Sequence, residues 1–154
     1  MPRLIRDGAI VDDAWLAPGP ENTVPKAGQI ASLDQWLQLA DKKGSAVQLE
    51  PGQQPDPLFE YLDQIQLVAI NFPVFTDGRG FSYARELRDR GYRGELRATG
   101  NFIRDQLTYL HRCGFNAFQL ADERGLEAAL DSLGDFSEVY QAAVDQPLPL
   151  FRRR

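Results

Sequence analysis

The chain of 154 residues has few of the side chains that most cofactor sites require, with one cysteine, Cys113, and one histidine, His111. A single cysteine cannot form an internal disulfide, a Cys-x-x-Cys pair or the ligand set of an iron–sulfur cluster. The lone histidine has no cysteine or histidine neighbour at the spacing of zinc or haem ligands. We therefore expect no metal and no redox cofactor, although a hard-cation site built from carboxylates stays open.

The sequence also lacks an excess of positive charge, a long apolar run and an apolar leader. Its net charge of −5 argues against nucleic acid as a partner, because binding to phosphates needs a basic face. No apolar run approaches the roughly 20 residues of a membrane span, and residues 1–7 contain no signal-peptide core. The expectation is a cytoplasmic protein. Neither the Rossmann glycine pattern nor a phosphate-binding P-loop occurs, so no nucleotide cofactor is predicted.

Helix-start signals alternate with short apolar runs along most of the chain. Ser32-Leu-Asp-Gln35 has the pattern of a capping box, and Asp56 precedes a proline. Ser82 and Asn101 are predicted to cap two helices that end near Arg90 and Arg112. Apolar runs that predict strands lie at 46–49, 67–72, 95–99 and 117–120, with a weaker one at 139–140.

This alternation predicts the fold class. Repeated βα units give an α/β protein with a mostly parallel sheet, here of four to five strands, either open or curved like half a barrel. Asp7-Gly8 predicts an N-terminal β-hairpin. We expect one domain over 1–154, made of a hairpin and extended loop (1–30), a βα core (31–145) and a tail (146–154). The apolar run 67–72 indicates a central strand covered on both faces.

The connection at 73–82 is long for a loop between a strand and a helix, which makes it the first candidate site. Its glycines allow close approach to a ligand, and Ser82 with the following amides offers a place for an anion. Arginine side chains add bidentate donors for an oxyanion. An ion pair within a simple turn is the alternative interpretation. The candidate ligand-binding residues are Asp77, Gly78, Arg79, Gly80, Ser82 and Arg85.

The second candidate site is the strand at 95–99. Alternation places Glu95, Arg97 and Thr99 on one face, with Leu96 and Ala98 on the other. Buried charges must be paired. These side chains are therefore expected either in a structural ion-pair network or lining a pocket together with the connection at 73–82. The residues proposed to line that pocket are Arg97, Thr99 and Asn101, with Asp105 and Gln106 at its rim, and all but Gln106 are candidate ligand-binding residues. Asp77 and Glu95 are the candidate catalytic carboxylates.

Several stretches together resemble one bacterial family. They are Phe75-Thr-Asp-Gly-Arg-Gly-Phe-Ser-Tyr-Ala-Arg, Gly94-Glu-Leu-Arg-Ala-Thr-Gly, Asp105-Gln-Leu and Arg112-Cys-Gly-Phe. The family is a proteobacterial domain family of unknown function that is often encoded beside assimilatory sulfite reductase, and some members are labelled as oxidoreductases in sulfite reduction. The resemblance implies a role near sulfur assimilation. An oxidoreductase activity conflicts with the absence of any electron carrier in the sequence.

Two functions from different classes follow. The first is an accessory protein for sulfite reduction that binds a partner, with sulfite reductase as the candidate, or a small anion, and has no redox cofactor. The second is a small enzyme acting on an anionic metabolite at the C-terminal ends of the strands.

The tail Pro147-Leu-Pro-Leu-Phe-Arg-Arg-Arg154 is either a solubilising end or a segment that docks on another subunit or partner. The second interpretation would make a homo-oligomer possible.

Overall fold

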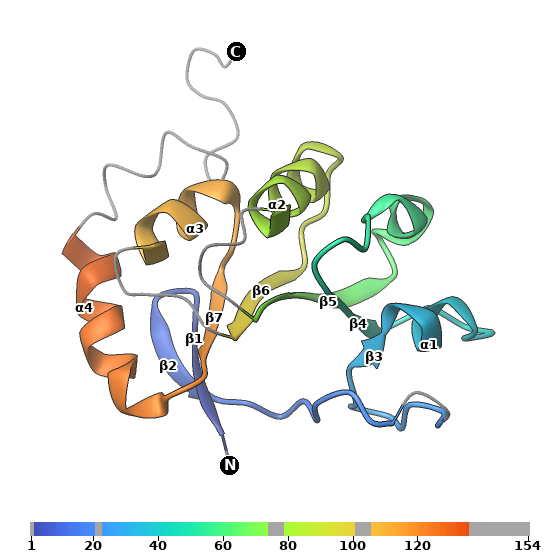
Figure 1. Ribbon diagram of the computed structural model, residues 1–154, viewed down its shortest axis with the longest axis horizontal. Coiled ribbons are helices and arrows are strands. Elements are labelled where there is room, and N and C mark those ends of the chain that lie inside the picture. The colour runs from blue at the N-terminus through green and yellow to red at the C-terminus, as the bar shows by residue number, and fades with distance from the viewer. Residues whose placement is uncertain (1, 21–22, 74–78, 101–105, 136–154) are drawn as a thin grey trace.

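The computed structural model describes residues 2–20, 23–73, 79–100 and 106–135 (Figure 1). The elements in chain order are β1 (Arg3–Arg6), β2 (Ala9–Asp12), β3 (Ala31–Ser32), α1 (Leu33–Leu37), β4 (Ser45–Leu49), the 3-10 helix η1 (Asp56–Tyr61), β5 (Ile65–Phe72), α2 (Arg79–Asp89), β6 (Glu95–Gly100), α3 (Leu107–Cys113), β7 (Ala117–Leu120), the 3-10 helix η3 (Glu123–Gly125) and α4 (Leu126–Asp135).

The strands form one seven-stranded sheet in the order β2-β1-β7-β6-β5-β4-β3. Neighbouring strands from β3 to β7 are parallel and follow one another in chain order. Right-handed crossovers that advance in one direction place every connecting helix on the same face of a sheet. The prediction of a mostly parallel α/β sheet is therefore confirmed, but the sheet has seven strands rather than four or five.

The additional strands come mainly from the N-terminal hairpin. Asp7 and Gly8 have φ values of 52° and 81°, which are those of a two-residue turn with both central residues in the left-handed region. This confirms the hairpin. β1 then pairs antiparallel with β7, with Ile5 opposite Phe118, so the hairpin extends the sheet instead of standing apart from it.

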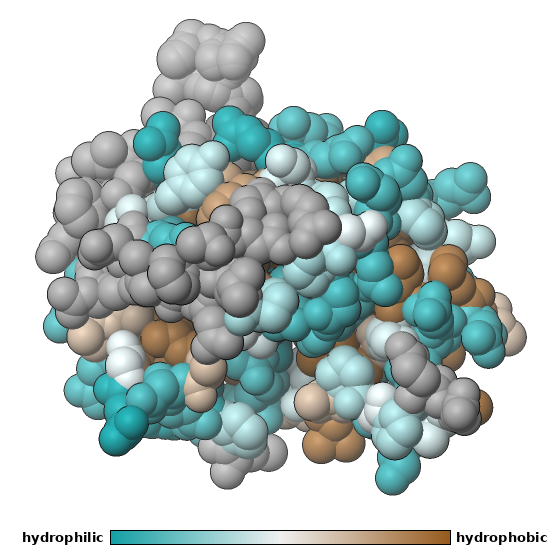
Figure 2. All heavy atoms as spheres, in the orientation of Figure 1, coloured by the Kyte–Doolittle hydropathy of each residue, from teal (hydrophilic) through white to brown (hydrophobic). Residues whose placement is uncertain are grey.

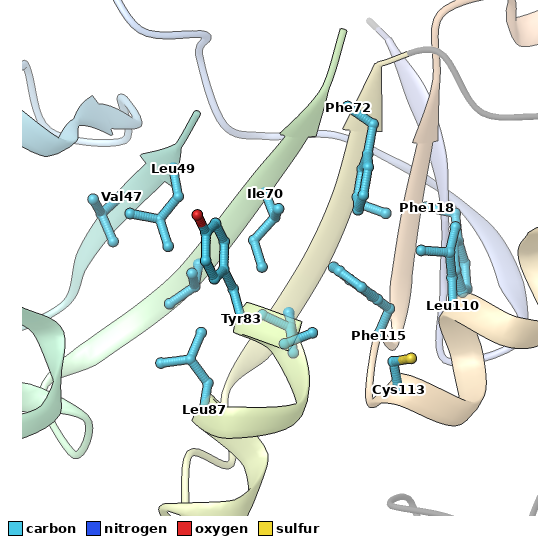
Figure 3. Packing of buried hydrophobic residues seen from close by; sticks show 14 of the residues in the cluster. Val47, Leu49, Ile70, Phe72, Tyr83, Leu87, Leu110, Cys113, Phe115 and Phe118 are labelled. Carbon is cyan, nitrogen blue, oxygen red and sulfur yellow. The ribbon is translucent and has the colours of Figure 1, made fainter. Parts of the chain in front are cut away.

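The helices cover one face of the sheet and enclose the main core. In Figure 3 side chains from alternate strand positions point toward the helices, among them Val47, Ile70 and Phe118. Leu87 of α2 and Leu110 of α3 meet them and are fully buried. We call this the helical face. Burial of large aliphatic and aromatic side chains here supplies the main favourable term for folding.

The opposite face, which we call the open face, is partly covered by the chain between β2 and β3. That segment runs along the side of the sheet away from the helices (Figure 1). Trp15 and Ile30 pack there against Ala46 and Leu67. Residues 67–70 of β5 are consequently buried on both sides, as the apolar run predicted.

Three local predictions have mixed outcomes. The capping box of α1 is present, with Ser32 accepting from the Gln35 amide. The helix expected to start at Ser82 begins at Arg79, so Ser82 lies in its first turn and does not cap it. α3 follows Gln106 rather than a cap at Asn101, which lies outside the described residues, as does the weak strand at 139–140.

Candidate functional site

The described members of the two predicted groups of site residues lie on opposite faces of the sheet. α2 packs on the helical face, whereas Glu95, Arg97 and Thr99 of β6 point to the open face. Leu96 and Ala98 belong to the core beneath the helices, which confirms the predicted alternation of β6. A single pocket that joins the α2 arginines to Arg97 is therefore not formed by the described residues.

On the helical face, Gly80 has a clear packing role. A Cβ at this position would lie 2.6 Å from the Phe72 ring and 2.8 Å from the Ile70 side chain. The first turn of α2 can approach β5 this closely only because the residue is glycine. Its suggested role in ligand binding stays a prediction, but packing alone explains why glycine is needed.

The other predicted residues of α2 lie at its surface. Ser82 is exposed, and Arg85 is exposed and donates to the main-chain oxygen of Arg112 at 3.3 Å. Arg79 starts the helix, and its side chain lies outside the described part of the structure, as do Asp77 and Gly78. Asn101 and Asp105 are also outside the described residues.

Arg97 lies at the centre of a buried group of charges on the open face. Its guanidinium is fully buried and donates from Nη1 and Nη2 to Asp13, at 3.1 and 3.3 Å. Nε donates to Glu95 Oε2 at 2.9 Å, and Nη2 lies 2.8 Å from the same oxygen. A second donation from Nη1 reaches Gln119 at 3.1 Å. The guanidinium therefore makes four hydrogen bonds within the chain and pairs with two carboxylates.

Glu95 connects this arginine to the hairpin. Its second carboxylate oxygen, Oε1, accepts from Arg6 Nη1 at 3.4 Å. We call Arg6, Asp13, Glu95 and Arg97 the ion cluster. The expectation that Glu95 and Arg97 are paired is confirmed, although the partners are Asp13 and Arg6 of the N-terminal region, which sequence reasoning did not identify.

A row of polar side chains crosses the open face at the C-terminal ends of the strands. Asn71 lies opposite Thr99, and Thr99 lies opposite Gln119, so the three share one rung of the sheet. All three are partly exposed. Asn71 donates to Glu50 at 2.7 Å, and Gln119 accepts from Arg97. We call Asn71, Thr99 and Gln119 the polar row.

The polar row still has hydrogen-bonding capacity. Among the described residues, no partner is assigned to the Thr99 hydroxyl or to the Gln119 amide nitrogen. Neighbouring strands are about 4.8 Å apart, so the row spans roughly 10 Å. Such a row can donate to and accept from a polar group placed against the end of the sheet.

The charge around the polar row does not favour an anion. The charged side chains described near the row are three carboxylates and two guanidinium groups, namely Glu50, Asp13 and Glu95 and the arginines Arg97 and Arg6. Both arginines already face carboxylates. Among the described residues, a small oxyanion would therefore meet neutral donors without an excess of positive charge.

At the other end of β6, two groups with shifted pKa values hold the chain in place. Arg88 of α2 donates to the main-chain oxygens of Gly114, at 2.8 Å, and of Tyr92, at 2.9 Å. Burial lowers the pKa of the Arg88 guanidinium. The Tyr92 hydroxyl donates to the Glu95 main-chain oxygen at 3.1 Å, and burial raises the pKa of this phenol. These contacts fix the start of β6 and thereby the position of Glu95.

The remaining titratable group of interest is Cys113, which is 1% exposed. It is a small residue of the core, and burial raises the pKa of its thiol. Within the described ranges, no group of three His, Cys, Asp or Glu side chains is placed to hold a metal ion. No described helix is both long and apolar enough to cross a bilayer.

Comparison with known proteins shows the family of this chain. The model of a family described as bacterial proteins of unknown function, DUF934, matches residues 46–151. The chain belongs to this family. No curated protein matches the chain.

The DUF934 match includes only part of the ion cluster. Glu95, Arg97 and the polar row lie within the matched residues, whereas Arg6 and Asp13 precede them. The N-terminal hairpin and the segment after it therefore complete the charge pairing of a DUF934 strand from outside the matched region.

Proposed function

We propose that this DUF934 protein is a cytoplasmic accessory protein of sulfite reduction that binds a partner and has no redox cofactor of its own. The link to sulfite reduction rests on the resemblance of the loop and strand motifs around Arg79 and Arg97. The partner-binding role rests on the geometry of the open face. Its only cysteine is buried, so the described residues offer no thiol pair for electron transfer.

The observation that carries the proposal is the full engagement of Arg97. A buried guanidinium that makes four hydrogen bonds and pairs with two carboxylates within the chain cannot also bind sulfite or sulfate without breaking the ion cluster. Breaking such a cluster costs several kcal/mol. The neutral polar row beside it suits amide or hydroxyl groups of a partner protein better than a free oxyanion.

Co-purification from the native host tests this function. The tagged chain should capture sulfite reductase, and a deletion strain should grow poorly with sulfate as the sulfur source. Thr99→Val removes an unpartnered hydroxyl while keeping the side-chain shape, so capture should weaken with little change in folding. Thr23→Val, at an exposed position before β3, is the matched control. Absence of sulfite reductase from the capture, together with normal growth of the deletion strain, would refute the proposal.

A second candidate is a small enzyme that acts on an anionic metabolite. The position of the polar row favours it, because parallel α/β sheets bind ligands at the C-terminal ends of their strands. The ion pairs of Glu95 count against that residue as the acid–base group, and Asp77 lies outside the described residues. A thermal-shift screen with sulfite, sulfate, phosphate and sugar phosphates decides. Stabilisation that Arg79→Ala abolishes would favour the enzyme, and no shift with any anion would exclude it.

A further inference from the structure

A separate group of side chains, three of them exposed and one, Phe81, half-buried, lies on the outer side of the helical layer, between α2 and α3. Phe81 and Arg85 are four residues apart on α2, and Tyr109 and Arg112 are three apart on α3, so each pair shares one side of its helix. We call these four residues the α2–α3 ridge. Figure 2 shows mostly hydrophilic residues along the part of the upper edge of the molecule that is not drawn in grey.

Direct contacts hold the ridge together. The Phe81 and Tyr109 rings meet edge to face with centroids 5.0 Å apart, and Arg85 bonds to the main chain of Arg112. Tyr109 is nevertheless 53% exposed. Arginine and aromatic side chains are the residue types that dominate protein interfaces, because both provide large contact area with directional contacts. The ridge therefore has the composition of an interface centre.

The segment that contains the ridge is basic in an otherwise acidic chain. Residues 79–112 contain eight arginines against four acidic residues, whereas the remainder contains nine basic residues against eighteen acidic ones. Arg97 of this segment is buried in the ion cluster on the open face, so the positive charge of the ridge itself comes from the exposed Arg85 and Arg112. On α2, the acidic Glu86 pairs with Arg90 at 3.5 Å on the other flank of the helix, beside the Phe59 ring. Within the described part of the chain, no carboxylate forms an ion pair with Arg85.

We propose that the α2–α3 ridge is a docking surface for an acidic protein partner. Charge complementarity favours an acidic protein as the partner. Arg85 and Arg112 of the ridge attract a compact acidic surface, whereas the acidic remainder of the chain repels an extended polyanion. An RNA or DNA backbone would extend beyond the patch onto the acidic remainder. The inference takes from the proposed function only that a protein partner exists. It adds a second docking surface, on the helical side of the sheet and separate from the polar row, and the charge of the surface that docks there.

Two binding assays test the ridge, one with poly-L-glutamate and one with purified sulfite reductase. Arg85→Glu should weaken binding of the chain to polyglutamate about tenfold, and Tyr109→Ala should weaken binding to sulfite reductase by a similar factor. Binding should fall steeply between about 50 mM and about 500 mM salt. Lys43→Glu makes the same charge change at an exposed site before β4 and should leave both affinities within about twofold. Circular dichroism and the unfolding midpoint verify that each variant folds.

The outcomes separate the ridge from the proposed function. If polyglutamate binding depends on Arg85 but sulfite reductase is never captured, the ridge stands and the sulfite-reductase role fails. If Arg85→Glu and Tyr109→Ala capture sulfite reductase as well as the natural chain does, the ridge is refuted and the role stands. Equal losses in Lys43→Glu, tighter binding to RNA than to polyglutamate, or no binding to either probe would also overturn the ridge.

Discussion

Replacing Arg97 by methionine removes the cation at the centre of the ion cluster while keeping an unbranched side chain in its place. Asp13, whose side chain is 4% exposed, would lose both of its hydrogen bonds to the guanidinium. Glu95 is 13% exposed and keeps Arg6, so its loss is smaller. Breaking one partner out of a buried pair costs about 3–5 kcal/mol. We expect the variant to lose about 4 kcal/mol of unfolding free energy.

Urea unfolding followed by circular dichroism measures this loss. With a slope of about 2 kcal/mol per molar urea, the midpoint should fall by about 2 M. Arg6→Met is the control within the same cluster. Because Arg6 is 40% exposed and lies 3.4 Å from Glu95, its removal should cost less than about 1 kcal/mol. Combining Arg97→Met with Asp13→Asn removes both charges and should recover part of the loss, with a coupling energy above about 1 kcal/mol.

The same variant distinguishes a structural arginine from a ligand-binding one. If Arg97→Met unfolds at the same urea concentration as the natural chain and yet loses a thermal shift with sulfite or phosphate, the reasoning from the ion cluster is wrong. Arg97 would then bind the ligand directly. A large stability loss without any anion effect in the natural chain is the result that the buried geometry predicts.

Three further substitutions or reactions probe the packing. Gly80→Ala would place a Cβ 2.6 Å from the Phe72 ring, so we expect a loss of about 2 kcal/mol in urea unfolding; an unchanged midpoint would contradict the close approach of α2. Tyr92→Phe should cost about 1 kcal/mol at neutral pH, because it removes the hydrogen bond to Glu95. Burial raises the pKa of Tyr92 in the folded chain above its unfolded value of about 10. The stability contributed by the protonated Tyr92 hydroxyl is therefore complete below about pH 10 and is lost as the pH rises through the pKa of the folded chain. The variant should therefore lose less stability than the natural chain in alkaline titration. Cys113, which is buried with a raised pKa, should react with a thiol reagent about tenfold more slowly in the folded chain than in urea, and equal rates would contradict its burial.

Local patterns were enough to predict most of the sheet. Each βα unit is built from neighbours in sequence, so the apolar runs and helix starts between residues 46 and 120 identify β4 to β7 directly. The Asp7-Gly8 turn likewise needs only two residues to specify it. What the pattern could not show was that β1 pairs with β7, because that contact depends on the position of the whole hairpin.

The same limit applied to the candidate site. Physical reasoning required partners for Glu95 and Arg97, since unpaired buried charges are costly. It could not name Asp13, which lies 84 residues from Arg97 in a stretch without periodic pattern. The polar row was missed for a related reason. Thr99 was identified, but Asn71 and Gln119 join it only once the register between three strands is fixed.

We interpret the ion cluster as a set of contacts that fixes the position of the segment around Asp13 relative to β6. A buried ion pair adds little stability compared with an apolar pair of similar volume, but it tolerates displacement poorly. β1 and β7 separate the hairpin strand β2 from β6, and Asp13 follows β2 at the point where the chain turns toward the open face. A shift of that segment by one residue that brought Ala14 to the position of Asp13 would remove the carboxylate from it. Arg97 would then lack its bidentate acceptor, at a cost of several kcal/mol. One strand order and one path across the open face are thereby favoured over their neighbours, and the side chain that resembled an anion-binding group in the sequence acts within the chain instead.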